Sequence, residues 1–181
     1  MDIKDILSGS SVKQIAKAVG IDEKSAEAVL KKAVPALLEN MSGNSKKSGG
    51  AQALQKALMA HADDDDDVNQ IDRKDGAKII SHILGDNAAD VKKSLAKAGG
   101  LDSSKVDDLL SIAGPMVMKS VGQKTKAKSK SGDLDLDDLL MDVMKDGLDL
   151  GDLKKIASKI DADDVKVAAE AVSKLFGSFK K

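Results

Sequence analysis

The chain has 181 residues, of which 41% are hydrophobic and only 1% aromatic, so it can bury an aliphatic core as one domain or as one domain with an appendage. It contains no cysteine, which excludes disulfides, thiolate metal sites and a cysteine nucleophile, and its formal net charge of −1 weakens any assignment to nucleic-acid binding. No stretch approaches the roughly 18–20 apolar residues of a membrane span or shows the apolar segment of a secretory signal, so we expect a cytoplasmic protein without membrane contact.

The apolar residues are Leu, Ile, Val, Ala and Met at helical spacing, and the β-branched and aromatic runs typical of strands are missing. This pattern predicts an all-α, multihelical fold. The expected helices are residues 2–8, 11–19, 22–41, 50–61, 74–84, 87–98, 102–122, 134–146, 150–159 and 161–177. Residues 42–50 and 63–75 have the composition of loops.

Residues 15–41 show the pattern of two consecutive helices joined by a tight turn. Gly20 can adopt the left-handed backbone that ends a helix, and Asp22 can accept hydrogen bonds from the free N–H groups at the start of the next helix. The second helix carries an apolar stripe that continues past Pro35. Because proline lacks an N–H and crowds the preceding turn, we expect one bent helix there, or two abutting ones.

A second copy of this unit occupies residues 95–121, which align with residues 15–41 at an offset of 80 positions without a gap. Gly100, Asp102 and Pro115 take the places of the turn glycine, the capping aspartate and the proline. The other identical pairs are Ala16 and Ala96, Lys17 and Lys97, Ala18 and Ala98, Leu30 and Leu110, and Ala33 and Ala113. The chain is therefore predicted to contain an internal duplication of helix-turn-helix-like units.

Three segments together resemble a known family. They are Gly20 to Pro35, the central stretch DGAKIISHILG from Asp75 to Gly85, and Gly100 to Pro115. This pattern is similar to that of the YidB-like bacterial proteins, the domain of unknown function 937 family, over about residues 1–122. The resemblance implies a multihelical, internally duplicated fold, and it implies no activity, because the family is uncharacterised.

Residues 123–132 read QKTKAKSKSG, with four lysines, no acid and no apolar residue except alanine. This composition is typical of a flexible linker, so we expect a duplicated core of residues 1–122 and a C-terminal unit of residues 133–181. The latter shows the apolar periodicity of three helices. With fewer than about 70 residues it is too small to be very stable alone, so we expect it to dock on the core or on another subunit.

An acidic segment contains the run from Asp63 to Asp67, together with Asp72 and Asp75, and follows His61. Carboxylates can bind Ca²⁺ or Mg²⁺, but the spacing is not that of an EF-hand and contiguous acids usually remain solvated. His82 lies in an apolar stretch without a partner motif, so we interpret it as a half-buried, hydrogen-bonded histidine. These residues therefore predict no metal site.

Three other patterns could carry function. The first helix-turn-helix-like unit could read DNA, but its second helix is nearly balanced in charge and the second copy places Asp102, Asp107 and Asp108 there. Gly122 to Thr125 echoes a phosphate-binding loop but has the wrong spacing and follows a helix. A cluster of methionines could form an adaptable contact surface, although core filling explains it equally well. Its members are Met116, Met118, Met141 and Met144.

No constellation of nucleophile, base and orienting group is visible, so we predict no catalytic, cofactor-binding or metal residues and no enzyme activity. The leading hypothesis is a non-enzymatic helical protein-interaction or scaffolding protein that binds a protein partner or self-associates. The alternative is a nucleic-acid-binding module that uses the helix-turn-helix-like units and the Lys-rich segment. This alternative is disfavoured because the chain has a single arginine, Arg73, and no strongly basic folded segment.

Overall fold

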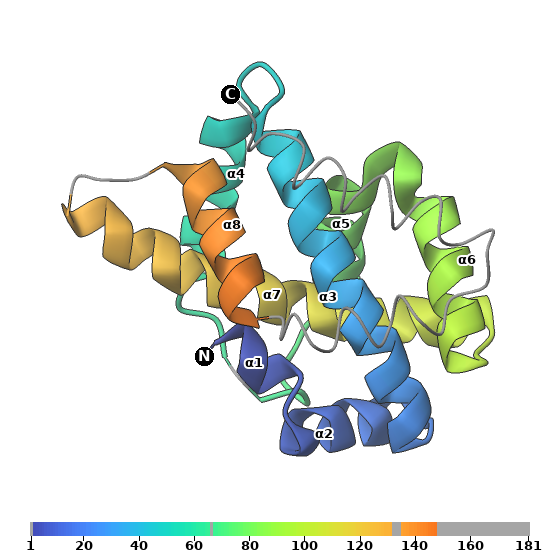
Figure 1. The fold of residues 1–181 in the computed structure, drawn as a ribbon. Helices are drawn as coiled ribbons and strands as arrows, with labels where there is room; N and C mark the ends of the chain where they lie inside the picture. Colours follow the sequence, from blue (N-terminus) through green and yellow to red (C-terminus); the bar gives the residue numbers. More distant parts are fainter. Residues whose placement is uncertain (1, 66, 132–134, 148–181) are drawn as a thin grey trace. The chain divides into compact units, whose positions relative to one another are not determined.

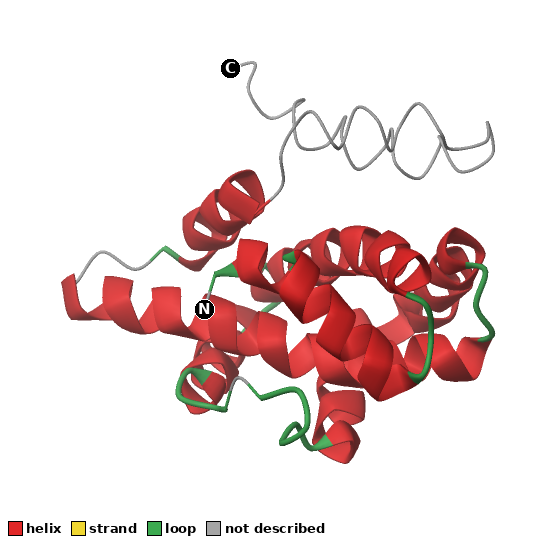
Figure 2. Ribbon diagram, turned by 90° about the horizontal axis from the view of Figure 1, so that it is seen from below, coloured by secondary structure: helices red, strands yellow, loops and turns green. Residues whose placement is uncertain are grey.

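The structure, a computed structural model, describes residues 2–65, 67–131 and 135–147, and these residues form helices joined by short loops without any strand (Figures 1 and 2). The helices are α1 (Ile3–Ile6), α2 (Gly9–Val19), α3 (Glu23–Ser45), α4 (Gly50–His61), α5 (Arg73–Leu84), η1 (Gly85–Asn87), α6 (Ala88–Gly99), α7 (Ser103–Ser131) and α8 (Leu136–Gly147). The all-α prediction is thus confirmed. Residues Met1–Gly147 form one compact unit, and the described part of the chain belongs to it.

The two copies of the duplicated unit have the same turn between their helices. Gly20 ends α2 with φ of 73°, and Gly100 ends α6 with φ of 62°, both in the left-handed region that favours glycine. In the first copy the N–H groups of Gly20 and Ile21 both donate to the carbonyl of Ala16, at 2.9 and 3.0 Å. In the second copy the equivalent carbonyl, that of Ala96, accepts from the equivalent two N–H groups. The turn prediction is therefore correct in both copies.

The long helix of each copy begins at an aspartate. Asp22 Oδ1 accepts from the N–H of Ser25, and Asp102 Oδ1 accepts from the N–H of Lys105, both at 2.9 Å. These hydrogen bonds stabilise the carboxylate form, so they lower the pKa of both aspartates below the ordinary value. The two caps are equivalent in residue, partner position and geometry, as expected for a duplication.

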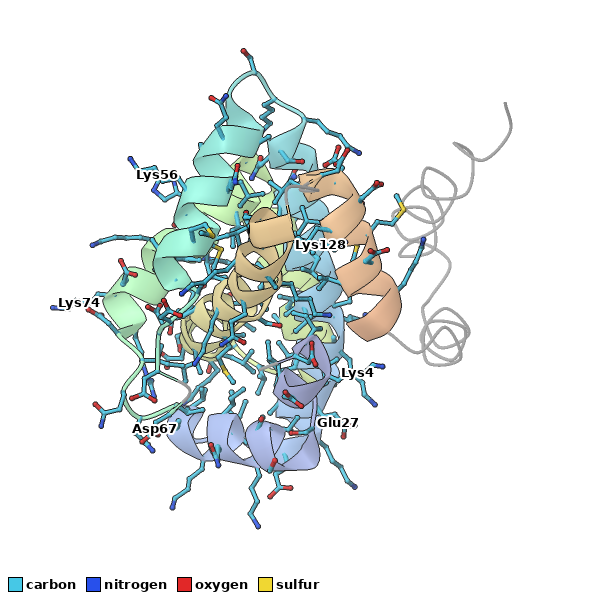
Figure 3. All side chains as sticks on the ribbon, turned by 90° about the vertical axis from the view of Figure 1, so that its left-hand side faces the viewer. Lys4, Glu27, Lys56, Asp67, Lys74 and Lys128 are labelled. Carbon is cyan, nitrogen blue, oxygen red and sulfur yellow. The ribbon has the colours of Figure 1, made fainter. Side chains whose placement is uncertain are left out.

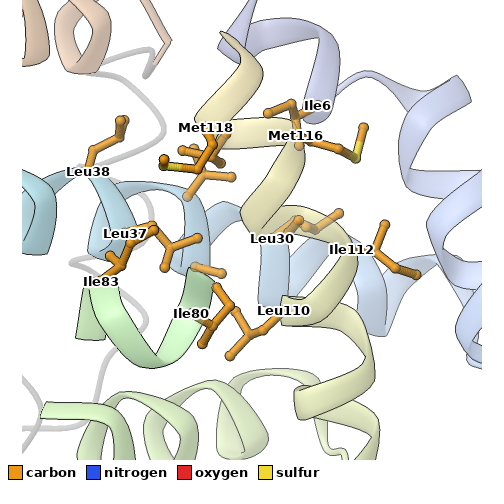
Figure 4. Close-up of a cluster of buried hydrophobic side chains, with 14 of the residues drawn as sticks. Ile6, Leu30, Leu37, Leu38, Ile80, Ile83, Leu110, Ile112, Met116 and Met118 are labelled. Carbon is orange, nitrogen blue, oxygen red and sulfur yellow. The ribbon is translucent and has the colours of Figure 1, made fainter. Parts of the chain in front are cut away.

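The two long helices, α3 and α7, supply half of the buried residues in the described core. Their buried side chains meet those of α5 and α1 in one continuous cluster (Figure 4). Among the side chains labelled there, α3 contributes Leu30, Leu37 and Leu38, α7 contributes Leu110, Ile112, Met116 and Met118, α5 contributes Ile80 and Ile83, and α1 contributes Ile6. Because aliphatic and thioether side chains fill this cluster, the scarcity of aromatic residues does not prevent a dense core.

Glycines allow α7 to cross its neighbours closely. A side chain at Gly76 of α5 would overlap the backbone carbonyl of Ser111, and one at Gly122 would overlap that of Leu58 on α4. A Cβ at Gly114 would lie 2.9 Å from the Cδ1 atom of Ile80, again at the crossing of α7 with α5. The Asp-Gly pair in the central segment of the family resemblance therefore has a packing explanation, because only glycine fits between these backbones.

Both prolines lie inside continuous helices. Pro35 is in α3 and Pro115 is in α7, and neither helix is interrupted by a loop. The apolar stripe continues through each proline as predicted: Ala33, Val34, Leu37 and Leu38 are all fully buried around Pro35. The prolines are thus part of the packed framework.

Two helix ends differ from the sequence prediction by more than two residues. Helix α3 continues to Ser45, four residues beyond its predicted end. The predicted linker at residues 123–132 is wrong, because α7 continues through residue 131, so the predicted domain boundary after residue 122 falls inside a helix. Lysine, alanine and glutamine are good helix formers, and Thr125 is fully buried, with its hydroxyl donating to the carbonyl of Val121 at 2.9 Å.

Of the C-terminal three-helix unit predicted at residues 133–181, the first helix is present as α8. The other two, predicted at 150–159 and 161–177, lie outside the described residues. Among the described helices, none has both the length and the hydrophobicity needed to cross a bilayer.

Candidate functional site

Helix α8 is amphipathic and covers a surface made by three other helices. Its buried side chains are Leu136, Leu139, Leu140 and Val143, which are 7%, 1%, 0% and 0% exposed. Their i, i+3, i+4, i+7 spacing places them on one face of the helix. They contact α1, α3 and α7, and we call the part of these three helices that α8 covers the docking face. Figure 1 shows α8 lying beside α3 above the N-terminal part of the chain.

The first turn of α8 is acidic. Asp135 accepts from the N–H groups of Asp137 and Asp138 at 2.9 and 3.3 Å, which caps the helix. Asp137 and Asp138 then lie at the positive end of the helix dipole, where carboxylates are favourable. An acidic, well-capped start and an apolar face together explain why this segment forms a helix.

Two polar contacts fix α8 on the docking face. The hydroxyl of Ser45, at the end of α3, lies 2.5 Å from Oδ1 of Asp137, and Ser45 is only 7% exposed. The ammonium of Lys128, which is labelled in Figure 3 and lies in the last part of α7, is 3.1 Å from Oδ2 of Asp142. The docking face is therefore apolar, with the hydroxyl of Ser45 and the ammonium of Lys128 at its edge. This composition suits a helix that has acidic residues beside an apolar stripe.

Three lysines of the predicted linker form ion pairs with acids from three separate segments. Lys124 pairs with Asp2 at 3.2 Å, and Lys126 pairs with Asp63 at 2.5 Å. Together with the pair formed by Lys128, these contacts tie the last turns of α7 to the N-terminus, to the acidic loop and to α8. Each exposed pair contributes less than about 1 kcal/mol, but together they reduce the positive potential of this segment.

The acidic segment is used mainly for local structure. Asp72 caps α5 by accepting from the N–H groups of Lys74 and Asp75, at 2.8 and 3.2 Å. Asp67 accepts from the backbone and side chain of Asn69, and Nδ1 of His61 lies 2.7 Å from Oδ2 of Asp64. No group of three His, Asp or Glu side chains that could hold a metal ion occurs among the described residues.

A depression of about 270 Å³ lies beside this segment, over the proline of α7. It is lined by Asp64, Asp65, Gln70, Ile71, Asp72, Asp75 and Pro115. Two of its carboxylates, Asp64 and Asp72, take part in the hydrogen bonds just described, so they serve the loop and the cap of α5. The depression is strongly acidic, and its described lining has carboxylates but no serine, threonine, histidine or lysine to act with them as a nucleophile or a second catalytic group.

The interpretation of His82 as half-buried is wrong, because its side chain is exposed. The buried residues of α5 are Gly76, Ile79, Ile80, Ile83 and Leu84, and this stripe leaves His82 on the outer face of the helix. Its backbone carbonyl accepts from Nδ2 of Asn44 at 3.3 Å, so the contribution of this residue to packing is through the backbone.

The second helix of each helix-turn-helix-like unit packs in the centre of the fold. Helix α3 packs against α2, α4, α5, α6, α7 and α8, and buried residues occur along its whole length. In α7 every residue from 109 to 122 is buried. The first turns of both helices keep exposed residues, among them Glu23, Lys24 and Glu27 in α3 and Ser104 and Asp107 in α7, whereas the later turns lie in the centre of the fold.

The remaining sequence candidates are structural. Gly122 lies inside α7, and the Thr125 hydroxyl donates to a helix carbonyl, so this segment has no phosphate-cradling loop. Met116 and Met118 are each 3% exposed and belong to the core, while Met144 packs on its edge. These three methionines therefore fill space between helices, whereas Met141 is only partly buried and is not part of the core cluster.

The sequence analysis did not find Ser45 and Lys128, the polar contacts of the docking face. Ser45 falls in a predicted loop and Lys128 in the predicted linker. The helix-forming composition of residues 123–129 could have indicated that α7 continues. The partner of Ser45, however, lies 92 positions away in the chain, and the partner of Lys128 lies 14 positions away. Sequence spacing alone does not reveal such non-local contacts.

Residues 2–124 match the family described as "Bacterial protein of unknown function (DUF937)", which covers more than half of the chain and agrees with the resemblance seen in the sequence. No curated protein and no solved structure matches the chain. The matched segment ends inside α7, so α8 lies beyond it.

Proposed function

Because the chain belongs to this family of bacterial proteins of unknown function, we propose that it is a non-enzymatic helical protein-interaction or scaffolding protein whose docking face binds an amphipathic helix. The observation that carries the proposal is the seating of α8 on α1, α3 and α7. Helix-in-groove recognition uses the same elements, with apolar anchors at i, i+3, i+4 and i+7 and polar contacts at the edge.

The composition of the docking face supports a binding role. Its helices α3 and α7 belong to the rigid centre of the fold, so the face is positioned by the core rather than by loops. A preformed surface loses little conformational freedom on binding, which favours recognition of a partner. The four apolar anchors of α8 are buried against the docking face. Displacement of α8 would therefore expose an apolar surface on the described unit.

Nucleic-acid binding has weaker support. The lysines on which that alternative depends, Lys124, Lys126 and Lys128, face carboxylates of the same chain. Phosphate binding would have to compete with those carboxylates for the same cations, and the second helices of both duplicated units are central.

The proposal can be tested with a peptide and the full-length chain. A fluorescent peptide of residues 135–147 is titrated with wild-type protein and with a variant carrying Leu139→Asp and Leu140→Asp, which cannot seat its own α8. Fluorescence anisotropy should show at least about tenfold tighter binding to the variant, because the resident helix of the wild type competes at an effective concentration of order millimolar.

The matched control is a peptide carrying the same two aspartates, which has lost two anchors and should not bind either protein. Far-UV circular dichroism and a cooperative thermal transition verify that the variant is folded. If the variant unfolds, the single change Leu140→Ala, which loosens α8 without adding charge, replaces it. Equal binding of both peptides, or no binding to a folded variant, would exclude the docking face as a helix-binding site.

A further inference from the structure

We propose that the docking face also takes α8 from a second copy of this chain, so that two chains exchange this helix. The inference rests on the proposed function, because it names the partner of the same site. Exchange of an identical element between protomers is an established route from a monomer to a dimer, because the exchanged element makes the same contacts in both forms.

The contacts between α8 and the docking face are specific, and a second copy of the chain carries a helix that matches them. Ser45 and Lys128 each meet a carboxylate of α8, Asp137 and Asp142, while the apolar anchors are nearly completely buried. Every copy of the chain carries this helix with these two acids at the right spacing. A second copy therefore satisfies the apolar and the charged requirements of the face without any change in either.

The charge distribution along the chain supports the same pairing. Residues 123–130, in the last turns of α7, contain four lysines and no acid, whereas residues 135–142 contain four aspartates and no base. The two segments thus attract each other whether they belong to one chain or to two. Two α8 helices in contact would instead bring acids together, so we expect exchange onto the docking face rather than direct pairing of α8 helices.

In the closed form α8 lies on its own chain, and in the exchanged form it lies on a second chain. The protein concentration determines which of the two forms is more populated. The contacts are the same, so the exchanged form must overcome only the effective concentration of the tethered helix, which is of order millimolar for a short connection. Exchange is thus a minority process at micromolar concentrations and grows with protein concentration. A disulfide between two exchanged chains would hold them together, so that the exchanged form accumulates. Because the chain has no native cysteine, only introduced cysteines can form that disulfide.

The test uses two full-length single-cysteine variants, Ser45→Cys and Asp137→Cys. Neither can form a disulfide within its own chain, so every disulfide joins two chains, and mixed disulfide above the collisional background of the control reports α8 of one chain on the docking face of the other. After oxidation of the mixture at about 100 µM, non-reducing electrophoresis should show the mixed dimer in excess over both homodimers. In the matched control, Ser104→Cys, which is exposed at the start of α7, replaces Ser45→Cys and should give about tenfold less mixed dimer.

A second measurement does not depend on disulfide geometry. Sedimentation of the wild-type chain at increasing concentration should show a dimer that is lost in the Leu139→Asp, Leu140→Asp variant. Mixed disulfide at the control level together with a monomeric wild type up to about millimolar concentration would overturn the exchange. If the peptide of residues 135–147 still binds the open variant in that case, the proposed function stands and the second copy is the wrong partner. Failure of both experiments would reject the docking face altogether.

Discussion

The ammonium group of Lys105 donates a hydrogen bond of 2.6 Å to the backbone carbonyl of Val19. Lys105 lies in the first turn of α7, and Val19 is the last residue of α2, so this bond joins the two copies of the duplicated unit. In the opposite direction, α6 of the second copy packs against α3 of the first, where a Cβ at Gly99 would lie 2.5 Å from a methyl of Val29. The two copies therefore interlock, each placing its short helix on the long helix of the other.

The first prediction concerns this bond. Lys105→Met keeps the length of the side chain but removes the cation from the C-terminal end of α2, where a positive charge is favourable. The free energy of unfolding in urea should fall by about 1–2 kcal/mol. Lys24→Met, at an exposed position of α3, is the control and should change it by less than about 0.5 kcal/mol. Equal effects of the two substitutions would show that the bond does not join the copies energetically.

The second prediction concerns the crossing of α5 and α7. Gly76→Ala adds a methyl group against the backbone of Ser111, so the helices must move apart, at a cost of about 1–3 kcal/mol. Gly43→Ala, in α3, meets open space and should stabilise the helix by about 0.5–1 kcal/mol. Thermal or urea denaturation measures both. A neutral Gly76→Ala would mean that the backbones are not in close contact at this position.

The duplicated part of the fold could be predicted from the sequence because its signals are local. Gly20 and Asp22 encode a turn and a cap within three residues, and the same signals recur in the second copy. The family match over residues 2–124 agrees with the resemblance seen in those segments. Local signals of this kind depend on neighbouring residues and survive without knowledge of the tertiary structure.

The docking face could not be predicted, because its contacts are non-local. A run of lysines with serine and glycine has the composition of a linker, and its contacts with Asp2, Asp63 and Asp142, which hold the helical segment in place, lie in other parts of the chain. Likewise, Ser45 gains its role from Asp137. The sequence predicted the helix that became α8, and its need for a partner surface, but not the surface itself.

The third prediction concerns pH. Backbone hydrogen bonds lower the pKa of Asp22 and Asp102 in the folded protein below the ordinary value of 3.8. Their stabilising effect is thus fully present above about pH 4 and is lost as the pH falls through the folded pKa. A double variant with Asp22→Asn and Asp102→Asn keeps cap acceptors that cannot be protonated.

This double variant should therefore lose less stability than the wild type between pH 5 and pH 2, which chemical denaturation at each pH measures. Asp22→Ala and Asp102→Ala should lower stability at neutral pH, because no acceptor remains for the N–H groups. Parallel stability curves for the wild type and the double asparagine variant would contradict the assigned role of the caps.

The fourth prediction concerns α8. Leu140 is fully buried against the docking face, so Leu140→Ala should lower the free energy of unfolding of the unit by about 2–4 kcal/mol or release α8 from it. Release should increase the fluorescence of an apolar dye, since the uncovered face is apolar. Met141→Ala, at a half-buried position one residue later, is the control and should have a smaller effect on both measurements. A dye-silent, fully stable Leu140→Ala variant would contradict the seating of α8.

The fifth prediction concerns duplex DNA. Because Lys124, Lys126 and Lys128 already face carboxylates, binding to random duplexes should be weak at about 0.15 M salt and should change little between 0.05 and 0.2 M salt. Titration by fluorescence anisotropy at several salt concentrations measures this. A steep salt dependence that disappears when the three lysines are replaced by glutamine would favour the nucleic-acid alternative.

The central claim is that α1, α3 and α7 form a face that binds an amphipathic, acidic helix. Hydrogen–deuterium exchange of the full-length Leu139→Asp, Leu140→Asp variant, with and without the unlabelled peptide of residues 135–147, tests it most directly. We predict that the peptide slows amide exchange in α1, in residues 38–45 of α3 and in residues 118–128 of α7, and leaves α5 and α6 unchanged. Protection of other helices, or no protection at a peptide concentration well above that of the protein, would contradict the account.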